Sequence, residues 1–205
     1  MAKTADKIDL FKEFKAEYKA TGKPALVETG PAWYLMIDGQ GTPGGAAFED
    51  RIGALYSMAF TIKMTRKFAG LGDYAVCKLE ALWYLEDGSE NFAITPQEAW
   101  CWTLMIRTPE CVKKADLKQA AKALLEKGKA EAVRDVRLEK LNEGKCVQLL
   151  HVGPYDQVCE AIEKMQAFVE EKGLSFAGKH HEIYLSDPRR VTPEKLKTIV
   201  RRPIE

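Results

Sequence analysis

The apolar residues in the first half of the chain show strand-like and helix-like spacing in turn. A continuous apolar run at 33–37 predicts a buried strand, which ends at the turn-forming residues of 39–45. Apolar residues then recur every three or four positions over about 46–66, as on one face of a helix. Two more apolar runs, at 74–85 and 100–107, predict strands. The helical stripe consists of Phe48, Ile52, Leu55, Tyr56, Ala59 and Ile62.

The second half repeats this order of strand, helix, strand and strand. A helical pattern and a short strand-like run join it to the first half. The turn residues Asn142, Glu143 and Gly144 follow that short run and predict a β-hairpin with the next strand. The predicted joining elements lie at 116–126 (helix) and 134–141 (strand), and those of the second half at 145–152 (strand), 156–172 (helix), 180–185 (strand) and 197–202 (strand).

Both halves therefore have the order β-α-β-β, which predicts an α+β fold built from two tandem units about a pseudo-twofold axis. Each unit has one helix and can cover one face of its sheet, so the opposite face needs its twin, a partner or a ligand. Seams between such units are common ligand sites, and we expect a central ligand groove there. We expect an N-terminal arm at 1–23, packed on a domain at 24–205, with half-units at about 25–110 and 130–205 and a linking helix at about 111–128.

Composition narrows the class of partner. Hydrophobic residues make up 46% of the chain and the formal net charge is +1, so the chain has material for a core but no charge excess to attract nucleic acid or an anionic membrane. No apolar run approaches the ~20 residues that span a bilayer. The polar start of the chain lacks the apolar stretch of a signal peptide, and the 5 cysteines show no paired spacing. We expect a cytoplasmic protein with free thiols.

Five stretches carry a family resemblance. They are YLMIDGQG at 34–41, LEALWY at 79–84, WCWTLMIRTP at 100–109, HVGPY at 151–155 and HHEIYLSDPRR at 180–190. Together they resemble the GyrI-like small-molecule-binding family over about residues 24–203. The chain departs from the family pattern in the loop at 41–44, which lacks a common carboxylate, and at Ala81 and Tyr84, which replace a common glycine and tryptophan.

The resemblance implies a duplicated β-α-β-β fold of the SHS2 type and a central cavity lined by aromatic residues around a glutamate. Relatives in this family act as drug-sensing halves of transcription regulators and as inhibitors of DNA gyrase. Stand-alone relatives are hydrolases of cyclopropane-bearing, DNA-alkylating natural products. Because the chain has balanced charge and no helix-turn-helix pattern, the stand-alone type is the closer match.

Glu182 is the first candidate for a catalytic residue. Alternate residues of a strand share a face, so His180, Glu182 and Tyr184 point one way and Ile183 and Leu185 the other. We expect the Ile183 side to meet the helices and the Glu182 side to meet the groove. A carboxylate in an aromatic site can attract a cation or act as a general base on water. The alternative is a salt-bridged structural glutamate.

Aromatic residues supply the candidate walls of a ligand site. Trp83, Trp100 and Trp102 offer flat faces for stacking, although tryptophans at strand spacing are as often core residues. Tyr155, after a Gly-Pro pair, is a candidate catalytic hydrogen-bond donor or a packing residue at a helix start. Tyr184 and His180, on the same strand face as Glu182, are further ligand-binding candidates, and Tyr56 is a weaker one.

Glu80 is a candidate ligand-binding carboxylate. It alternates away from Trp83, so a bulge would be needed to bring both into the groove, and its alternative is a salt bridge.

No metal site, phosphate-binding loop or cofactor is predicted. The chain has 3 histidines, and His180 and His181 are adjacent in a strand and point apart. Three functions remain open: hydrolysis of a strained cyclopropane, binding of an aromatic small molecule for sequestration or sensing, and a protein-interaction role like that of a gyrase inhibitor. The expected partner is a small aromatic molecule, with the chain acting as a monomer or homodimer.

Overall fold

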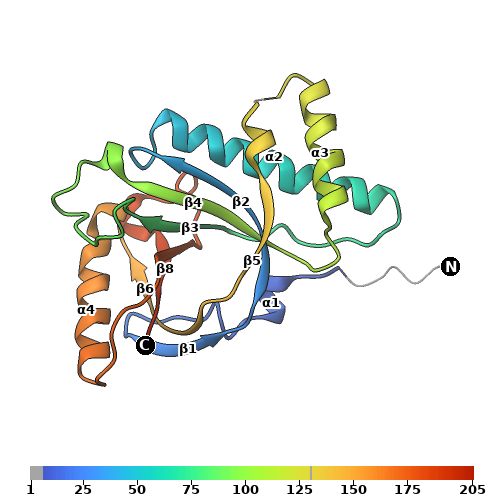
Figure 1. The fold of residues 1–205 in the computed structure, drawn as a ribbon. Helices are drawn as coiled ribbons and strands as arrows, with labels where there is room; N and C mark the ends of the chain where they lie inside the picture. The colour runs from blue at the N-terminus through green and yellow to red at the C-terminus, as the bar shows by residue number, and fades with distance from the viewer. Residues whose placement is uncertain (1–6, 130) are drawn as a thin grey trace.

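The computed structural model describes residues 7–129 and 131–205. At its centre lies one antiparallel sheet of eight strands in the order β1-β6-β8-β7-β3-β4-β2-β5 (Figure 1). The strands are β1 (Ala25–Thr29), β2 (Ala32–Gln40), β3 (Leu79–Tyr84), β4 (Cys101–Thr108), β5 (Arg137–Leu141), β6 (Gly144–Val152), β7 (His180–Tyr184) and β8 (Lys197–Pro203).

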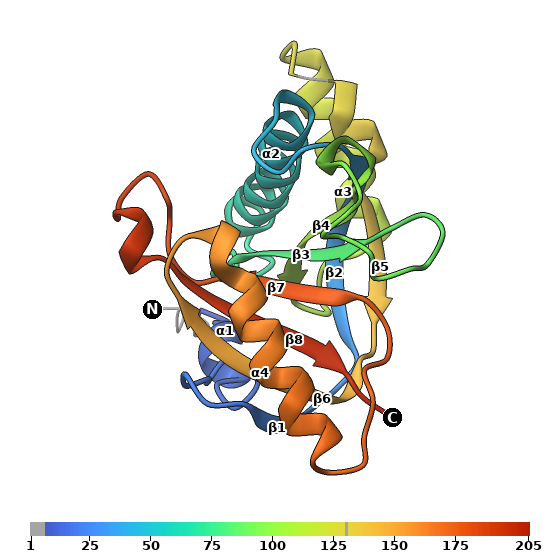
Figure 2. The same cartoon turned by 90° about the vertical axis from the view of Figure 1, so that its left-hand side faces the viewer.

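Two helices pack on one face of this sheet. Helix α2 contacts β2 and β4, and α4 contacts β6 and β8, so the central strands β3 and β7 pass between them (Figure 2). Helix α3 packs on α2 and joins the halves. The helices are α1 (Leu10–Glu13), α2 (Ala46–Phe68), α3 (Lys114–Glu126) and α4 (Val158–Glu170), with short 3₁₀ turns at Gln97–Ala99, Glu131–Asp135, Tyr155–Gln157 and Pro193–Lys195.

The strand order has the predicted internal symmetry. β2, β4 and β3 on one side of the centre correspond to β6, β8 and β7 on the other, and the two groups meet where β3 pairs with β7. The α+β fold of two tandem β-α-β-β units is therefore confirmed. The bounds of the predicted elements lie within a few residues of those observed, except that the strand expected from residue 74 begins at Leu79, and β1 has no predicted counterpart.

Each unit also exchanges one strand with the other, which corrects the predicted hairpin. β5 pairs with β2 and not with β6, while β1 pairs with β6. The two chain segments stay aligned on both sides of residues 30–31 and 142–143. Ala32 pairs with Leu141 before the β5–β6 connection, and Thr29 pairs with Gly144 after it. The Asn142-Glu143 step thus carries the chain forward instead of reversing it. Because the chain passes directly from one end of the sheet to the other, the sheet must curl.

The two faces of the sheet have different coverings. The face under α2 and α4, called here the helix face, contributes Leu35, Leu104 and Val200 to the main core clusters. The opposite face, called here the arm face, is covered by the N-terminal arm (residues 7–24). There Tyr18 of the arm packs against Ile183 and Ile199.

The expectation that Ile183 and Leu185 point to the helices is therefore wrong. The strict alternation along β7 holds, but both faces are apolar, and the apolar side chains of β7 lie under the arm. Glu182 and Tyr184 consequently lie on the helix face, opposite the position that the sequence suggested.

Candidate functional site

Five of the predicted site residues meet on the helix face, in the central part of the sheet where β3 pairs with β7: Trp83, Tyr155, His180, Glu182 and Tyr184. We call Trp83, Tyr155, Glu182 and Tyr184 the Glu182 cluster. Trp83 Nε1 donates a hydrogen bond to the Tyr184 hydroxyl at 3.2 Å. The rings of Tyr155 and Tyr184 meet edge to face, with centroids 5.6 Å apart. His180 Nε2 lies 3.0 Å from Glu182 Oε1, so His180 supports the carboxylate from the same strand.

The Glu182 carboxylate is largely shielded from water, with 12% of its side chain exposed. Burial raises the pKa of Tyr184 well above its ordinary value, and the negative charge of Glu182 raises it further. Burial also raises the pKa of Tyr155, with added effects from Glu182 and Asp187. Both phenols therefore keep their protons at neutral pH and remain hydrogen-bond donors beside the carboxylate.

Trp100 and Trp102 both lie on the helix face but differ in how far their rings are buried. Trp100 packs edge to face on Trp83 at 6.2 Å and donates from Nε1 to the Thr95 carbonyl. Trp102 is fully buried. Its ring lies across Gly39, where an added Cβ would come within 2.0 Å of it. Trp102 therefore forms part of the core behind Trp83 and presents no surface to a ligand.

Tyr56 lies on α2 and packs against the same core as Trp83 and Tyr184. Its ring stacks on Phe60 at 6.2 Å, and half of Phe60 is exposed. Burial raises the pKa of Tyr56, and the Asp187 carboxylate adds to the effect. Tyr56 thus lies between the core and the loop that follows β7.

Glu80 is separated from Glu182 by the sheet. β3 pairs with β7 in regular register, with Glu80 opposite Ile183 and Ala81 opposite Glu182, so the bulge suggested for this strand is absent. Glu80 is fully buried on the arm face and accepts hydrogen bonds from the Tyr18 hydroxyl at 3.1 Å and from His181 Nε2 at 3.0 Å.

The arm face holds a buried ion network that the sequence did not reveal. His181 Nδ1 lies 3.0 Å from Glu143, and Arg201 Nη1 lies 3.3 Å from the same carboxylate. Burial opposes the charge on His181, but Glu143 and Glu80 outweigh it and raise its pKa to about 9. Likewise, His181 and Arg201 outweigh the burial of Glu143 and lower its pKa to about 2. The available signal was the presence of Glu80, His181 and Arg201 within otherwise apolar strands, whereas Glu143 lies in the turn before β6 and gave no such signal.

The N-terminal arm completes this network. Arg107 Nη1 contacts Glu17 of the arm at 2.7 Å and the Tyr18 hydroxyl at 3.3 Å. Arg201 Nη2 donates to the Glu17 carbonyl at 2.5 Å. The arm is therefore held by buried charges as well as by apolar contacts.

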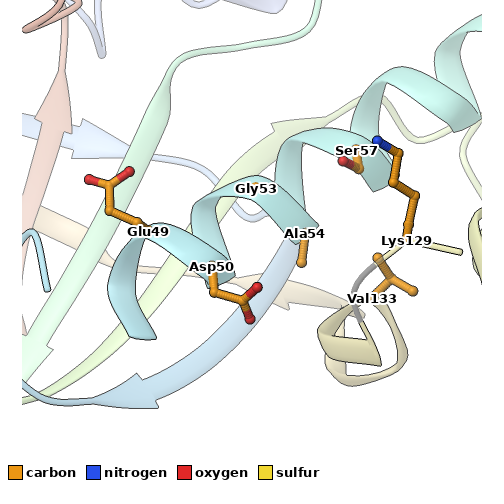
Figure 3. Close-up of a pocket in the computed structure, with 7 residues that line it drawn as sticks. All are labelled: Glu49, Asp50, Gly53, Ala54, Ser57, Lys129 and Val133. Carbon is orange, nitrogen blue, oxygen red and sulfur yellow. The ribbon is translucent and has the colours of Figure 1, made fainter. Parts of the chain in front are cut away.

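A surface hollow of about 320 Å³ lies elsewhere, against α2 and the turn after α3 (Figure 3). In Figure 3, Ser57 of α2 lies near Lys129, while Glu49 points away from them. None of the predicted site residues lines this hollow. Its lining residues are Glu49, Asp50, Gly53, Ala54, Ser57, Lys129 and Val133.

Comparison with known proteins identifies the family of this chain. The model of the GyrI-like small molecule binding domain matches residues 23–205. The chain belongs to the GyrI-like family. A conserved protein from Listeria innocua is 37% identical, covers 97% of this chain and 100% of its own, and has a TM-score of 0.90. Among curated protein sequences none matches.

Two further structures extend this picture of the GyrI-like chain. A hydrolase from Listeria innocua is 35% identical with a TM-score of 0.86, covering 97% of this chain and 100% of its own. The C-terminal domain of EcmrR is 13% identical with a TM-score of 0.56, covering 89% of this chain and 97% of its own. The second likeness shows a shared fold alone.

Residues 7–129 and 131–205 lack two further features, a metal-ligand cluster and a membrane-spanning helix. No group of three or more histidine, cysteine, aspartate or glutamate side chains is placed there to hold a metal ion. In the same ranges, no helix has the length and apolar character needed to cross a bilayer.

Proposed function

We propose that the Glu182 cluster binds a compact planar aromatic molecule and adds water to a strained cyclopropane ring that the molecule carries. The observation that carries this proposal is a shielded carboxylate with two protonated phenols and an indole around it. Membership of a small-molecule-binding family supports the ligand class, and 35% identity to a protein named as a hydrolase supports the reaction class.

The ligand would stack against Trp83 and the ring of Tyr155. Trp83 and Glu182 are nearly covered, whereas 39% of Tyr155 is exposed. The ligand would therefore approach the carboxylate from the side of the exposed Tyr155. Aromatic faces beside a carboxylate also favour a ligand with positive character.

Glu182 would act as general base on a water molecule. The water oxygen bonds to a ring carbon of the cyclopropane and passes its proton to Glu182. The ring C–C bond breaks, and its electron pair moves through the conjugated system onto the carbonyl oxygen of the ligand. Tyr155 or Tyr184 would donate a hydrogen bond to that oxygen as negative charge develops. Glu182 then transfers the proton that it took from water to the same oxygen. The sum is addition of one water.

A comparison of two glutamine variants tests this role. We expect Glu182→Gln to slow water addition to a planar ketone conjugated to a cyclopropane by about 10²- to 10⁴-fold, as for loss of a general base. Mass spectrometry follows the gain of one water. The control is Glu163→Gln, an exposed glutamate on α4 that should leave the rate unchanged. Equal rates for Glu182→Gln and the unmodified protein would contradict the assignment.

The second candidate function is binding without turnover, which the cage of Trp83, Tyr155 and Tyr184 around a carboxylate also favours. It predicts that the ketone quenches tryptophan fluorescence but keeps its mass after incubation. Recovery of the compound with unchanged mass would therefore support sequestration or sensing over hydrolysis.

A further inference from the structure

Thr198 presents an unpaired hydroxyl beside the Glu182 cluster. It lies on β8, where it pairs with Tyr184 of β7 on one side and His151 of β6 on the other. The three side chains therefore share the helix face. Thr198 is fully buried, and its Oγ1 has no hydrogen-bond partner.

In contrast to Thr198, the polar groups of Tyr184, His180 and His151 have hydrogen-bond partners. The Tyr184 hydroxyl accepts from Trp83 at 3.2 Å, and His180 lies 3.0 Å from Glu182. His151 Nε2 lies 2.9 Å from the Pro154 carbonyl oxygen. Among these groups, all within the described part of the chain, Thr198 alone lacks a partner.

A buried hydroxyl without a partner destabilises the fold, since it has lost water and gained no hydrogen bond in return. Valine has nearly the same shape and a high preference for strands, so the strand itself does not require a threonine at this position. A hydroxyl that the free protein leaves unpaired beside a ligand-binding cluster is accounted for if the bound ligand supplies the missing partner.

We propose that Thr198 is a specificity-determining residue of the Glu182 cluster, whose hydroxyl forms a hydrogen bond with a polar group on the edge of the ligand that faces β8. This inference rests on the proposed function, because it needs a ligand in contact with Tyr184. It narrows the ligand class: the aromatic ring system carries a carbonyl, amide or hydroxyl on that edge in addition to the carbonyl activated for water addition.

The isosteric variant Thr198→Val, which lacks the hydroxyl, and the variant Thr198→Ser, which keeps it, test the inference in two independent measurements. Without ligand, Thr198→Val should raise the melting temperature by about 2–4 °C, the shift expected from about 1 kcal/mol in a chain of this size. With a planar cyclopropyl ketone that carries an amide on its ring edge, followed by tryptophan quenching, Thr198→Val should raise the dissociation constant about threefold to tenfold. Thr198→Ser should restore wild-type affinity.

The outcomes separate this inference from the proposed function. Equal affinity of wild type and Thr198→Val for the amide-bearing ketone overturns the role of Thr198 and leaves the proposed function standing. A lowered melting temperature of Thr198→Val also overturns it, since the hydroxyl would then have a partner in the free protein. A wild-type protein that binds no such ketone overturns the proposed function and this inference together.

Discussion

Charged residues on the two faces of the sheet differ in how deeply they are buried and how fully they are paired. On the helix face, Glu182 is shielded but has 12% of its side chain exposed and a histidine as neighbour. On the arm face, Glu80 and His181 are fully buried, with Glu143 and Arg201 around them. A buried, fully paired network suits a structural role, whereas a partly exposed carboxylate among phenols suits a role in ligand chemistry.

The buried network predicts a pH window of stability. The pKa of His181 rises from 6.5 to about 9 on folding, so its contribution is complete below pH 6.5 and is lost as pH rises through 9. The pKa of Glu143 falls from 4.5 to about 2, so its contribution is complete above pH 4.5 and is lost as pH falls through 2. We expect the network to contribute most between about pH 4.5 and 6.5.

Urea denaturation of wild type and His181→Gln at pH 5.5 and 9.5 measures this effect. The free energy of unfolding of the wild type should fall between the two pH values, and that fall should be smaller in His181→Gln, which has no imidazole to titrate. Glu143→Gln serves as a second variant, because it removes one of the two carboxylates that hold the proton. A fall of the same size in His181→Gln would argue against a charged His181.

At the scale of elements, the N-terminal arm covers the face of the sheet for which the sequence suggested a twin unit, a partner or a ligand. Its sequence is mostly polar, and α1 (Leu10–Glu13) within it is only four residues long. What holds the arm is a few specific contacts: Tyr18 to Glu80, Glu17 to Arg107, and the stacking of Phe11 on Tyr18 at 4.8 Å. Pairings of this kind depend on residues far apart in sequence, so periodicity cannot reveal them.

Removing the Tyr18 hydroxyl should loosen the arm. In Tyr18→Phe the buried Glu80 loses one donor, which should lower the free energy of unfolding by about 1–3 kcal/mol. Hydrogen–deuterium exchange should rise over residues 8–22 more than in the core strands. The exposed Lys15→Ala is the matched control and should change neither quantity. Unchanged exchange over the arm would show that the hydroxyl does not anchor it.

At the scale of the whole molecule, the sequence predicts the order of elements far better than their pairing. Apolar spacing and turn residues located the helices and most strands, because these patterns are local. The exchange of β1 and β5 between units depends on whether the chain reverses at Asn142–Glu143 or continues, and a short polar turn permits both. The predicted face of Glu182 is wrong for a similar reason: alternation separates two faces but does not say which one meets the helices.

The exchanged strands also make the halves depend on each other. Separating them breaks the pairings of β1 with β6, β2 with β5 and β3 with β7, and leaves His181 without Glu80. Fragments 1–128 and 129–205 divide the chain at the exposed Gly128 and keep α3 with the helix α2 that it packs against. Each fragment alone should therefore expose unpaired strand edges and show no cooperative unfolding by circular dichroism.

Mixing equal amounts of the two fragments should restore a cooperative transition, because the exchanged strands then find their partners. The same mixture made with Glu80→Gln in the first fragment should assemble more weakly, since His181 would lose a charged partner at the pairing of β3 with β7. A cooperative transition in either fragment alone would show that a half-unit is stable without the exchange. The duplicated units would then be independent domains joined at β3 and β7, instead of one curled sheet shared between them.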